Sequence, residues 1–194
     1  MKIYCFDFDG TIADTVPLIT KTLNSMFKGE VSEERIKEEG LKKIIREMKI
    51  SPIKLFFLVR KARTEMNKEI KKMKPIEGMK EVLEELEKRG HTLGILTSNS
   101  KRNVVDFLKE SDLPLFDFIV TSSILGKEKK IRKTKRRGDL VYIGDETRDV
   151  EAGRGAGVYT IAVTWGLNSE KQLLSVNPDM IARKPEEILD FKFN

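Results

Sequence analysis

Three features are scarce or missing in this chain of 194 residues, and each absence narrows the class of protein. There is one cysteine, so no internal disulfide can form, and Cys5 is expected to be a small core residue of a strand. No apolar run reaches the length of a transmembrane helix, which argues against a helical membrane protein. The first residues lack a basic region followed by an apolar core, so we expect no signal peptide and a cytoplasmic protein.

The composition that remains is that of a globular protein rich in charge. Hydrophobic residues make up 39% of the chain, charged residues make up 35%, and the formal net charge is +6. A chain of this length can bury one large core and still carry a modest insertion. The basic excess could steer anionic substrates or nucleic acid, although its simplest role is to aid solubility.

The stretch from Lys2 to Thr15 reads K-I-Y-C-F-D-F-D-G-T-I-A-D-T, and the rest of the chain is organised around it. Its apolar beginning predicts a strand that is buried on both faces of a parallel sheet. Asp7 and Asp9 lie two residues apart, so in a strand both carboxylates point to the same side. Two neighbouring carboxylates repel each other and raise one pKa unless a cation lies between them. We therefore expect a functional site at the end of this strand.

The pattern after this stretch divides the chain into two parts. Residues 15–75 have a helical period throughout, and the expected helices cover 17–28, 32–48 and 51–70. From Gly78 onward strands and helices alternate, and the further strands are expected at 91–97, 117–120, 140–143, 159–163 and 179–182. This alternation predicts a doubly wound parallel sheet. The expected architecture is an α/β core formed by residues 1–14 and 76–194, with an all-helical cap domain, 15–75, inserted after the first strand.

Four polar clusters follow successive strands of the expected sheet. Because ligands of such sheets bind at the carboxyl ends of the strands, the four clusters should share one pocket. They contain carboxylates, hydroxyls and one cation, without histidine or thiol, and they consist of Asp7 and Asp9, Thr97-Ser98-Asn99, Lys127, and Asp145 with Asp149. Oxygen ligands suit Mg²⁺, and a carboxylate can attack phosphorus to form an aspartyl-phosphate. The cluster chemistry thus favours phosphoryl transfer, which depends on positioning and charge neutralisation.

The motifs resemble those of the haloacid dehalogenase-like superfamily, most of whose members are phosphatases. F-D-F-D-G-T resembles the first motif, D-x-D-G-T, and G-D-E-T-R-D after L-V-Y-I resembles the last. With T-S-N at residues 97–99 and a lysine near 127, the resemblance spans nearly the whole chain. It is greatest to the phosphoglycolate phosphatase-like branch, which has a helical cap inserted after the first strand and a second hinge similar to Pro75-Ile-Glu-Gly78.

The resemblance implies roles for the catalytic residues. Asp7 matches the nucleophile, and Asp9 matches the general acid and base that protonates the leaving oxygen and later activates water. Lys127, at the beginning of a helix, matches the motif lysine, with Lys130 as the alternative and Lys129 facing solvent.

The resemblance also implies ligands for Mg²⁺ and for the phosphoryl group. The metal would be held by Asp7, by the backbone carbonyl of Asp9 and by Asp145, with Asp149 supporting them from behind. The phosphoryl oxygens would be bound by the hydroxyl of Thr97 or of Ser98, together with Gly10 and Asn99.

The expected function is that of a Mg²⁺-dependent phosphatase that hydrolyses a small phosphomonoester, such as a phosphoglycolate-like anion, as a monomer or homodimer without a membrane partner. Residues 15–74 contain 16 Lys and Arg against 8 Asp and Glu, so the cap would favour an anionic leaving group. Arg60, Lys61 and Arg63 are the residues to test.

Three other functions compete with this one. A phosphomutase could use the same core, whereas a dehalogenase would leave Asp9 and the metal carboxylates without a role. A protein that binds nucleic acid or processes its phosphate ends could use the basic helix 127–137, which lacks aromatic residues for base stacking and is therefore disfavoured.

Overall fold

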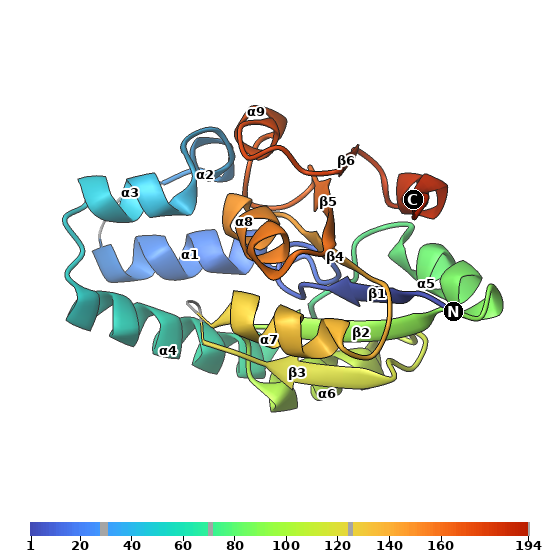
Figure 1. Ribbon diagram of the computed structural model, residues 1–194. Coiled ribbons are helices and arrows are strands. Elements are labelled where there is room, and N and C mark those ends of the chain that lie inside the picture. The colour runs from blue at the N-terminus through green and yellow to red at the C-terminus, as the bar shows by residue number, and fades with distance from the viewer. Residues whose placement is uncertain (28–30, 70–71, 124–125, 194) are drawn as a thin grey trace.

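The computed structural model describes residues 1–27, 31–69, 72–123 and 126–193 (Figure 1). Its centre is a parallel six-stranded sheet in the order β3-β2-β1-β4-β5-β6. The strands are β1 (Ile3–Phe6), β2 (Thr92–Thr97), β3 (Phe118–Thr121), β4 (Leu140–Gly144), β5 (Tyr159–Val163) and β6 (Met180–Ala182). The predicted doubly wound parallel sheet is confirmed.

The first strand lies in the middle of this sheet, as its continuous apolar run predicts. All of β1 is buried, and it pairs with β2 on one side and with β4 on the other. After β1 the chain adds β2 and β3 on one side of it, and then adds β4, β5 and β6 on the other side. The strand order therefore reverses between β1 and β4, which is where open α/β sheets bind their ligands.

Helices cover both faces of the sheet. They are α5 (Met79–Lys88), α6 (Lys101–Glu110), α7 (Lys127–Lys135), α8 (Thr147–Ala156), α9 (Glu170–Leu174) and the 3₁₀-helix η2 (Pro185–Asp190). Alternate residues of β1 enter two apolar cores, because Tyr4 and Phe6 pack with α5, α6 and η2, whereas Ile3 and Cys5 pack with α7 and α8. The sequence did not predict α9.

Between β1 and α5 the described residues form four helices, α1 (Val16–Phe27), α2 (Glu33–Glu39), α3 (Leu41–Glu47) and α4 (Pro52–Glu69), which we call the helical block. The expected helix ends at Lys28 and Ile70 lie outside the described residues. The block lies beyond the carboxyl end of β1 (Figure 1). The division into domains at residues 15 and 75 stays a prediction.

The single helix expected over 32–48 is wrong, because the chain turns at Gly40. This residue has φ 79°, in the left-handed region that favours glycine, and α2 and α3 lie on either side of it. A Cβ atom at this position would lie 3.0 Å from Nε2 of Gln172 in α9. The turn therefore also permits a close approach between the helical block and the loop region after β5.

A segment of the core docks into the helical block. Leu167, which follows β5, belongs to the same apolar cluster as Leu23, Ile36 and Ile44 of the block. The backbone N–H of Ser169 also donates to the carbonyl of Lys37 at 2.8 Å. The block is thus held to the segment after β5 by packing and a hydrogen bond, as well as by its two chain connections. Within the described residues, no helix is both long and apolar enough to cross a membrane.

Candidate active site

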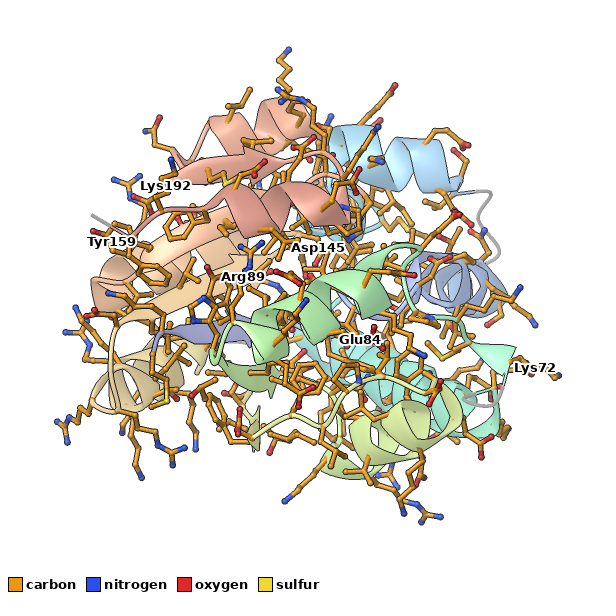
Figure 2. The ribbon with its side chains drawn as sticks, turned by 90° about the vertical axis from the view of Figure 1, so that its right-hand side faces the viewer. Lys72, Glu84, Arg89, Asp145, Tyr159 and Lys192 are labelled. Atoms are coloured by element: carbon orange, nitrogen blue, oxygen red, sulfur yellow. The ribbon has the colours of Figure 1, made fainter. Side chains whose placement is uncertain are left out.

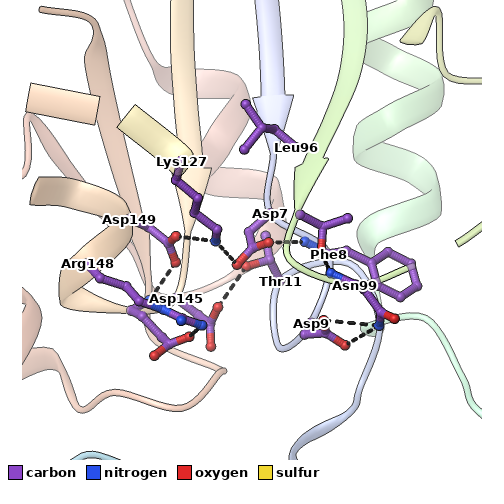
Figure 3. A network of polar contacts seen from close by, with 12 residues as sticks. Asp7, Phe8, Asp9, Thr11, Leu96, Asn99, Lys127, Asp145, Arg148 and Asp149 are labelled. Carbon is purple, nitrogen blue, oxygen red and sulfur yellow. Dashed lines mark hydrogen bonds and ion pairs between the residues drawn. The ribbon is translucent and has the colours of Figure 1, made fainter. Parts of the chain in front are cut away.

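Polar side chains from four strand ends meet at the carboxyl edge of the sheet (Figure 3). Asp7 follows β1, Asn99 follows β2, Lys127 begins α7 after β3, and Asp145 follows β4. Asp145 is 0% exposed and lies in the interior of the molecule (Figure 2). The four predicted clusters are therefore brought together, while the chemical role of each residue stays a prediction.

Lys127 lies between two buried carboxylates. Its Nζ donates to Oδ2 of Asp7 and to Oδ1 of Asp149, each at 2.5 Å, while Oδ1 of Asp7 accepts the N–H of Phe8 at 2.8 Å. Burial by itself would lower the pKa of Lys127, but the charges of Asp149 and Asp7 outweigh it and hold that pKa above its usual value. The lysine therefore carries a charge at neutral pH.

The alternative lysine does not reach this site. Lys127 is 2% exposed, whereas Lys129 and Lys130 are exposed on the outer side of α7. Between the two lysines that the sequence left open, the structure places Lys127 at the carboxylates.

The carboxylate of Asp145 is enclosed by two segments of the chain. Its Oδ1 accepts from the hydroxyl of Thr11 at 3.1 Å, and its Oδ2 accepts from the N–H of Leu167 at 2.7 Å. A Cβ on Gly10 or on Gly166 would lie 2.4 or 2.1 Å from Oδ2, so both glycines are needed for this closeness. The contacts of Thr11 and Leu167 were not predicted, and nothing in the local sequence distinguishes the N–H of Leu167.

Asp7, Asp145 and Asp149 form a group that we call the acidic cluster, in which one oxygen of each lies within 4.8 Å of the others. Burial raises the pKa of Asp7, which Lys127 opposes and Asp149 reinforces. Burial also raises the pKa of Asp145 well above its usual value, and neighbouring carboxylates add to this effect. A cation bound at the cluster would relieve this repulsion and favour the ionised form of each carboxyl group.

The donor set fits Mg²⁺. The acidic cluster, Asp9 and Glu146 provide five carboxylates, against two cationic side chains, Lys127 and Arg148, whose guanidinium pairs with Glu146. Oxygen donors of this kind suit a hard divalent ion. The predicted ligands are Asp7, the backbone carbonyl of Asp9 and Asp145, with Asp149 behind them. The structure places Asp149 beside Asp7 and Asp145, where it also binds Lys127, and the ligand set itself stays a prediction. The carboxylate of Asp9 is bound elsewhere.

Asp9 is held by an amide. The Nδ2 of Asn99 donates to both carboxylate oxygens of Asp9, at 3.1 and 3.2 Å. Burial, followed by the charge of Asp7, raises the pKa of Asp9 to about 7, although the bond from Asn99 opposes the shift. A carboxyl group with this pKa can both donate and accept a proton near neutral pH.

The residues predicted to bind the phosphoryl group lie around this pair. Thr97, the last residue of β2, is buried, and its hydroxyl accepts the N–H of Asn99 at 2.9 Å, while Ser98 directly after the strand is half-buried. Gly10 has φ 72° and begins the turn after Asp9, with its N–H on the carbonyl of Ala13. The choice between the two hydroxyls stays open.

The cap residues that the sequence marks for testing all belong to α4. Lys61 donates from Nζ to Oγ of Ser25 at 2.9 Å, which joins α4 to α1. Arg60 is exposed, and the side chain of Arg63 lies outside the described part of the structure.

Comparison with known proteins agrees with this geometry. The family model for haloacid dehalogenase-like hydrolases matches residues 4–163. The phosphoglycolate phosphatase of Synechococcus elongatus is 30% identical over 203 aligned residues, which cover 97% of this chain and 96% of that protein. The pyrophosphatase PpaX of Bacillus mycoides is 27% identical, covering 95% and 93% of the two chains.

The fold is shared with solved structures. A haloacid dehalogenase-like family hydrolase from Streptococcus pneumoniae has a TM-score of 0.79 and 23% identity, over 98% of this chain and 97% of that one. Together with relatives that are named phosphatases and match along the full length, these findings confirm the predicted enzyme class. The chain belongs to the haloacid dehalogenase-like hydrolase family, within which it is a phosphatase.

Proposed function

We propose that this phosphatase hydrolyses a small phosphomonoester, a phosphoglycolate-like anion, through an aspartyl-phosphate on Asp7, with Mg²⁺ bound at the acidic cluster. The observation that supports this proposal is the separate environment of two neighbouring carboxyl groups. Asp7 is paired with the cation of Lys127, whereas Asp9 is held by the amide of Asn99 and has a pKa of about 7. The pair thus offers a charged nucleophile beside a group that can exchange a proton.

In the first step, a carboxylate oxygen of Asp7 forms a bond to phosphorus and the bond from phosphorus to the leaving oxygen breaks. Asp9 transfers its proton to that oxygen, so the product leaves with a neutral hydroxyl group instead of an alkoxide. Lys127 stays protonated and offsets the negative charge near Asp7. Mg²⁺, when bound, would neutralise charge on the phosphoryl oxygens and hold them at the acidic cluster.

In the second step, water attacks the phosphorus of the aspartyl-phosphate. Asp9, now a carboxylate, accepts a proton from this water, and the bond between phosphorus and Asp7 breaks. Phosphate leaves, Asp7 returns as a carboxylate, and Asp9 is again protonated for the next turnover.

The charge of the helical block supports an anionic substrate. Residues 15–74 carry 16 Lys and Arg against 8 Asp and Glu, and the block lies beyond the carboxyl edge of the sheet (Figure 1). Positive potential near a site raises the local concentration of anions. A carboxylate-bearing phosphoester fits this potential.

Pyrophosphate is a second candidate substrate. The observation in its favour is the relative from Bacillus mycoides, which is named a pyrophosphatase and matches this chain along nearly the same length as the Synechococcus enzyme. Pyrophosphate is also small and anionic, and its hydrolysis could use the same two steps.

Phosphate release tests the proposal. Purified protein is assayed with 2-phosphoglycolate, pyrophosphate, p-nitrophenyl phosphate and hexose phosphates, in Mg²⁺ and in EDTA, beside Asp7→Asn. We expect Mg²⁺-dependent release that falls by at least about 10³-fold in Asp7→Asn, because this variant lacks the nucleophile. Release that survives in Asp7→Asn, or none from any substrate by the folded parent, contradicts the proposal. Phosphoryl transfer between hexose phosphates without net release would instead indicate a mutase.

Binding to nucleic acid is tested separately. A labelled oligonucleotide is titrated with the protein at low salt, where contacts between lysines and phosphates are strongest. The proposal expects no binding that competes with small phosphoesters. Tight, salt-sensitive binding that blocks hydrolysis would favour the nucleic-acid alternative.

A further inference from the structure

The amide that holds Asp9 is itself held by a second asparagine. Asn103 lies in the first turn of α6 and is 0% exposed. Its Nδ2 donates to Oδ1 of Asn99 at 3.0 Å, and the N–H of Ser100 donates to the same oxygen at 2.8 Å. Hydrogen bonds therefore connect Asp9 through Asn99 to Asn103 in α6. Figure 3 shows the bonds between Asp9 and Asn99.

This chain of hydrogen bonds determines which end of the Asn99 amide faces Asp9. An asparagine can present either its oxygen, which only accepts, or its NH₂, which only donates. Because Oδ1 of Asn99 accepts from Ser100 and Asn103, the NH₂ group is left to face the carboxylate of Asp9. If the amide were reversed, its oxygen would face a carboxylate and its NH₂ would face two donors.

The burial of Asn103 indicates that its side chain has more than a packing role. It shares the inner side of α6 with Val104 and Phe107, where an apolar residue would need no hydrogen-bond partner. A buried amide costs free energy unless its polar atoms are paired. Here the pairing connects a rigid helix to the group that holds Asp9.

We propose that Asn103 is a positioning residue for Asp9: it orients the amide of Asn99 so that the Asp9 carboxyl stays directed at the leaving oxygen. This inference depends on the proposed function. The Nδ2 of Asn103 donates to Oδ1 of Asn99, so Asn103 acts on Asp9 through Asn99. Loss of Asn103 leaves the nucleophile Asp7 and its partner Lys127 in place.

The proposal predicts an effect that depends on the leaving group. An alkoxide leaves poorly without a proton from Asp9, whereas p-nitrophenolate leaves readily without one. A displaced Asp9 should therefore slow the hydrolysis of alkyl phosphates much more than that of p-nitrophenyl phosphate. Because Asn103 does not take part in substrate binding, KM should change little.

Two variants remove the orienting bond in different ways. Asn103→Leu has a similar shape and lacks the donor, whereas Asn103→Asp presents an oxygen to Oδ1 of Asn99 and favours rotation of that amide. Ser100→Ala is the matched control, because it removes the N-cap hydroxyl that accepts the N–H of Asn103 and leaves the side-chain bonds intact. It should cost about 1 kcal/mol of stability, which the unfolding curve measures.

The decisive measurement is kcat and KM for a series of phosphomonoesters whose leaving groups differ in pKa, from 2-phosphoglycolate to p-nitrophenyl phosphate. We expect both Asn103 variants to lower kcat for the alkyl ester by about tenfold and for the most acidic leaving group by less than about threefold, with KM within about twofold. Ser100→Ala should keep the parent's dependence on the leaving group.

Two results would overturn the inference. One is an equal loss for all leaving groups in both variants, and the other is parental kinetics in a folded Asn103→Asp. If Asn103→Leu does not fold, Asn103→Asp decides by itself, since it is isosteric with the parent. Failure of the proposed function gives a different result from failure of this inference. In that case the parent would release no phosphate, or Asp7→Asn would release as much phosphate as the parent.

Discussion

The acidic cluster and the helical block use charge in opposite ways. At the cluster, Lys127 is 2% exposed and bonds to two carboxylates that are also buried. In the block, pairs such as Arg35–Glu39 and Lys43–Glu47 lie on the surface at helical spacing. Exposed pairs of this kind contribute about 0–1 kcal/mol, whereas breaking a buried pair leaves a desolvated charge behind.

This contrast matches the two tasks that we propose for these regions, the chemistry and the choice of substrate. The residues proposed for the chemistry are fixed by the sheet, by burial and by several hydrogen bonds each. The residues proposed to choose the substrate lie on helices whose charges are solvated and tolerate change. Substitutions at the cluster should therefore affect both activity and stability, and substitutions on the block should affect substrate preference.

The largest effect is expected for Lys127→Met. It leaves Asp7 and Asp149 buried without their shared cation, which should cost roughly 3–5 kcal/mol of unfolding free energy. It should also lower kcat/KM by at least about 10²-fold, because the cation beside Asp7 is lost. Urea unfolding and steady-state kinetics measure the two effects.

Lys130→Met is the control for this variant. Lys130 is exposed on the same helix and was the alternative that the sequence allowed. Its substitution should change stability by less than about 0.5 kcal/mol and leave kcat/KM unchanged. Equal effects of the two substitutions would show that the buried pairing does not matter.

Leu167→Ala tests whether the block and the cluster are coupled. The Leu167 side chain packs in the core of the helical block, while its N–H binds Oδ2 of Asp145. The cavity should cost about 2–4 kcal/mol, and a loosened Asp145 should raise the Mg²⁺ concentration needed for half-maximal activity several-fold. Thermal unfolding with and without Mg²⁺ gives a second readout of metal binding.

Leu173→Ala provides the comparison. Leu173 is buried like Leu167, but it packs with Val150 and Ala162 rather than with the helical block. A similar loss of stability without a change in the Mg²⁺ requirement is expected. If both variants shift the Mg²⁺ requirement equally, the coupling through Leu167 is wrong.

Asp9→Asn should stabilise the metal-free protein at high pH. The pKa of Asp9 is about 7 in the folded protein against about 3.8 when it is not perturbed, so between these values the folded state binds more protons. The parent therefore loses stability as pH rises through this range, and the variant lacks that loss. Its advantage should be near zero below pH 4 and should grow by up to about 1.4 kcal/mol per pH unit until about pH 7, where it levels off.

Urea unfolding in EDTA at several pH values measures this difference. Other carboxyl groups also titrate, but their contribution is common to parent and variant and largely cancels in the comparison. A stability difference that does not depend on pH would show that Asp9 keeps an ordinary pKa in the folded state.

The sequence predicts the sheet and the meeting of its strand ends because both depend on short-range patterns. Apolar runs define β1, β2 and β4, and parallel strands necessarily place Asp7, Thr97 and Asp145 at one edge. Motif residues that directly follow a strand are positioned by that strand alone. Their convergence therefore needs no knowledge of the loops.

The remaining site contacts depend on the directions of segments far apart in the chain. The helix phase of α7 decides that Lys127 is buried and Lys130 exposed, which a run of lysines cannot reveal. The bond from Leu167 to Asp145 depends on where the loop after β5 turns. In the sequence, Asn103 looks like an ordinary residue in the first turn of a helix, and only the structure shows its bond to Asn99.

The smallest effect is expected from charge reversal on the helical block, by Arg60→Glu combined with Lys61→Glu. If the positive potential of the block attracts the substrate, KM for 2-phosphoglycolate should rise about two- to fivefold at low salt, and kcat should stay the same. The rise in KM should shrink in 0.5 M salt, because the Debye length falls to about 4–5 Å and interactions between exposed charges weaken. Lys54→Glu, at the beginning of α4, is the control for reversal on the same helix. A KM that stays constant for every anionic substrate would mean that the charge of the block serves solvation, and that substrate choice must be sought in the residues that enclose Asp9 and Asp145.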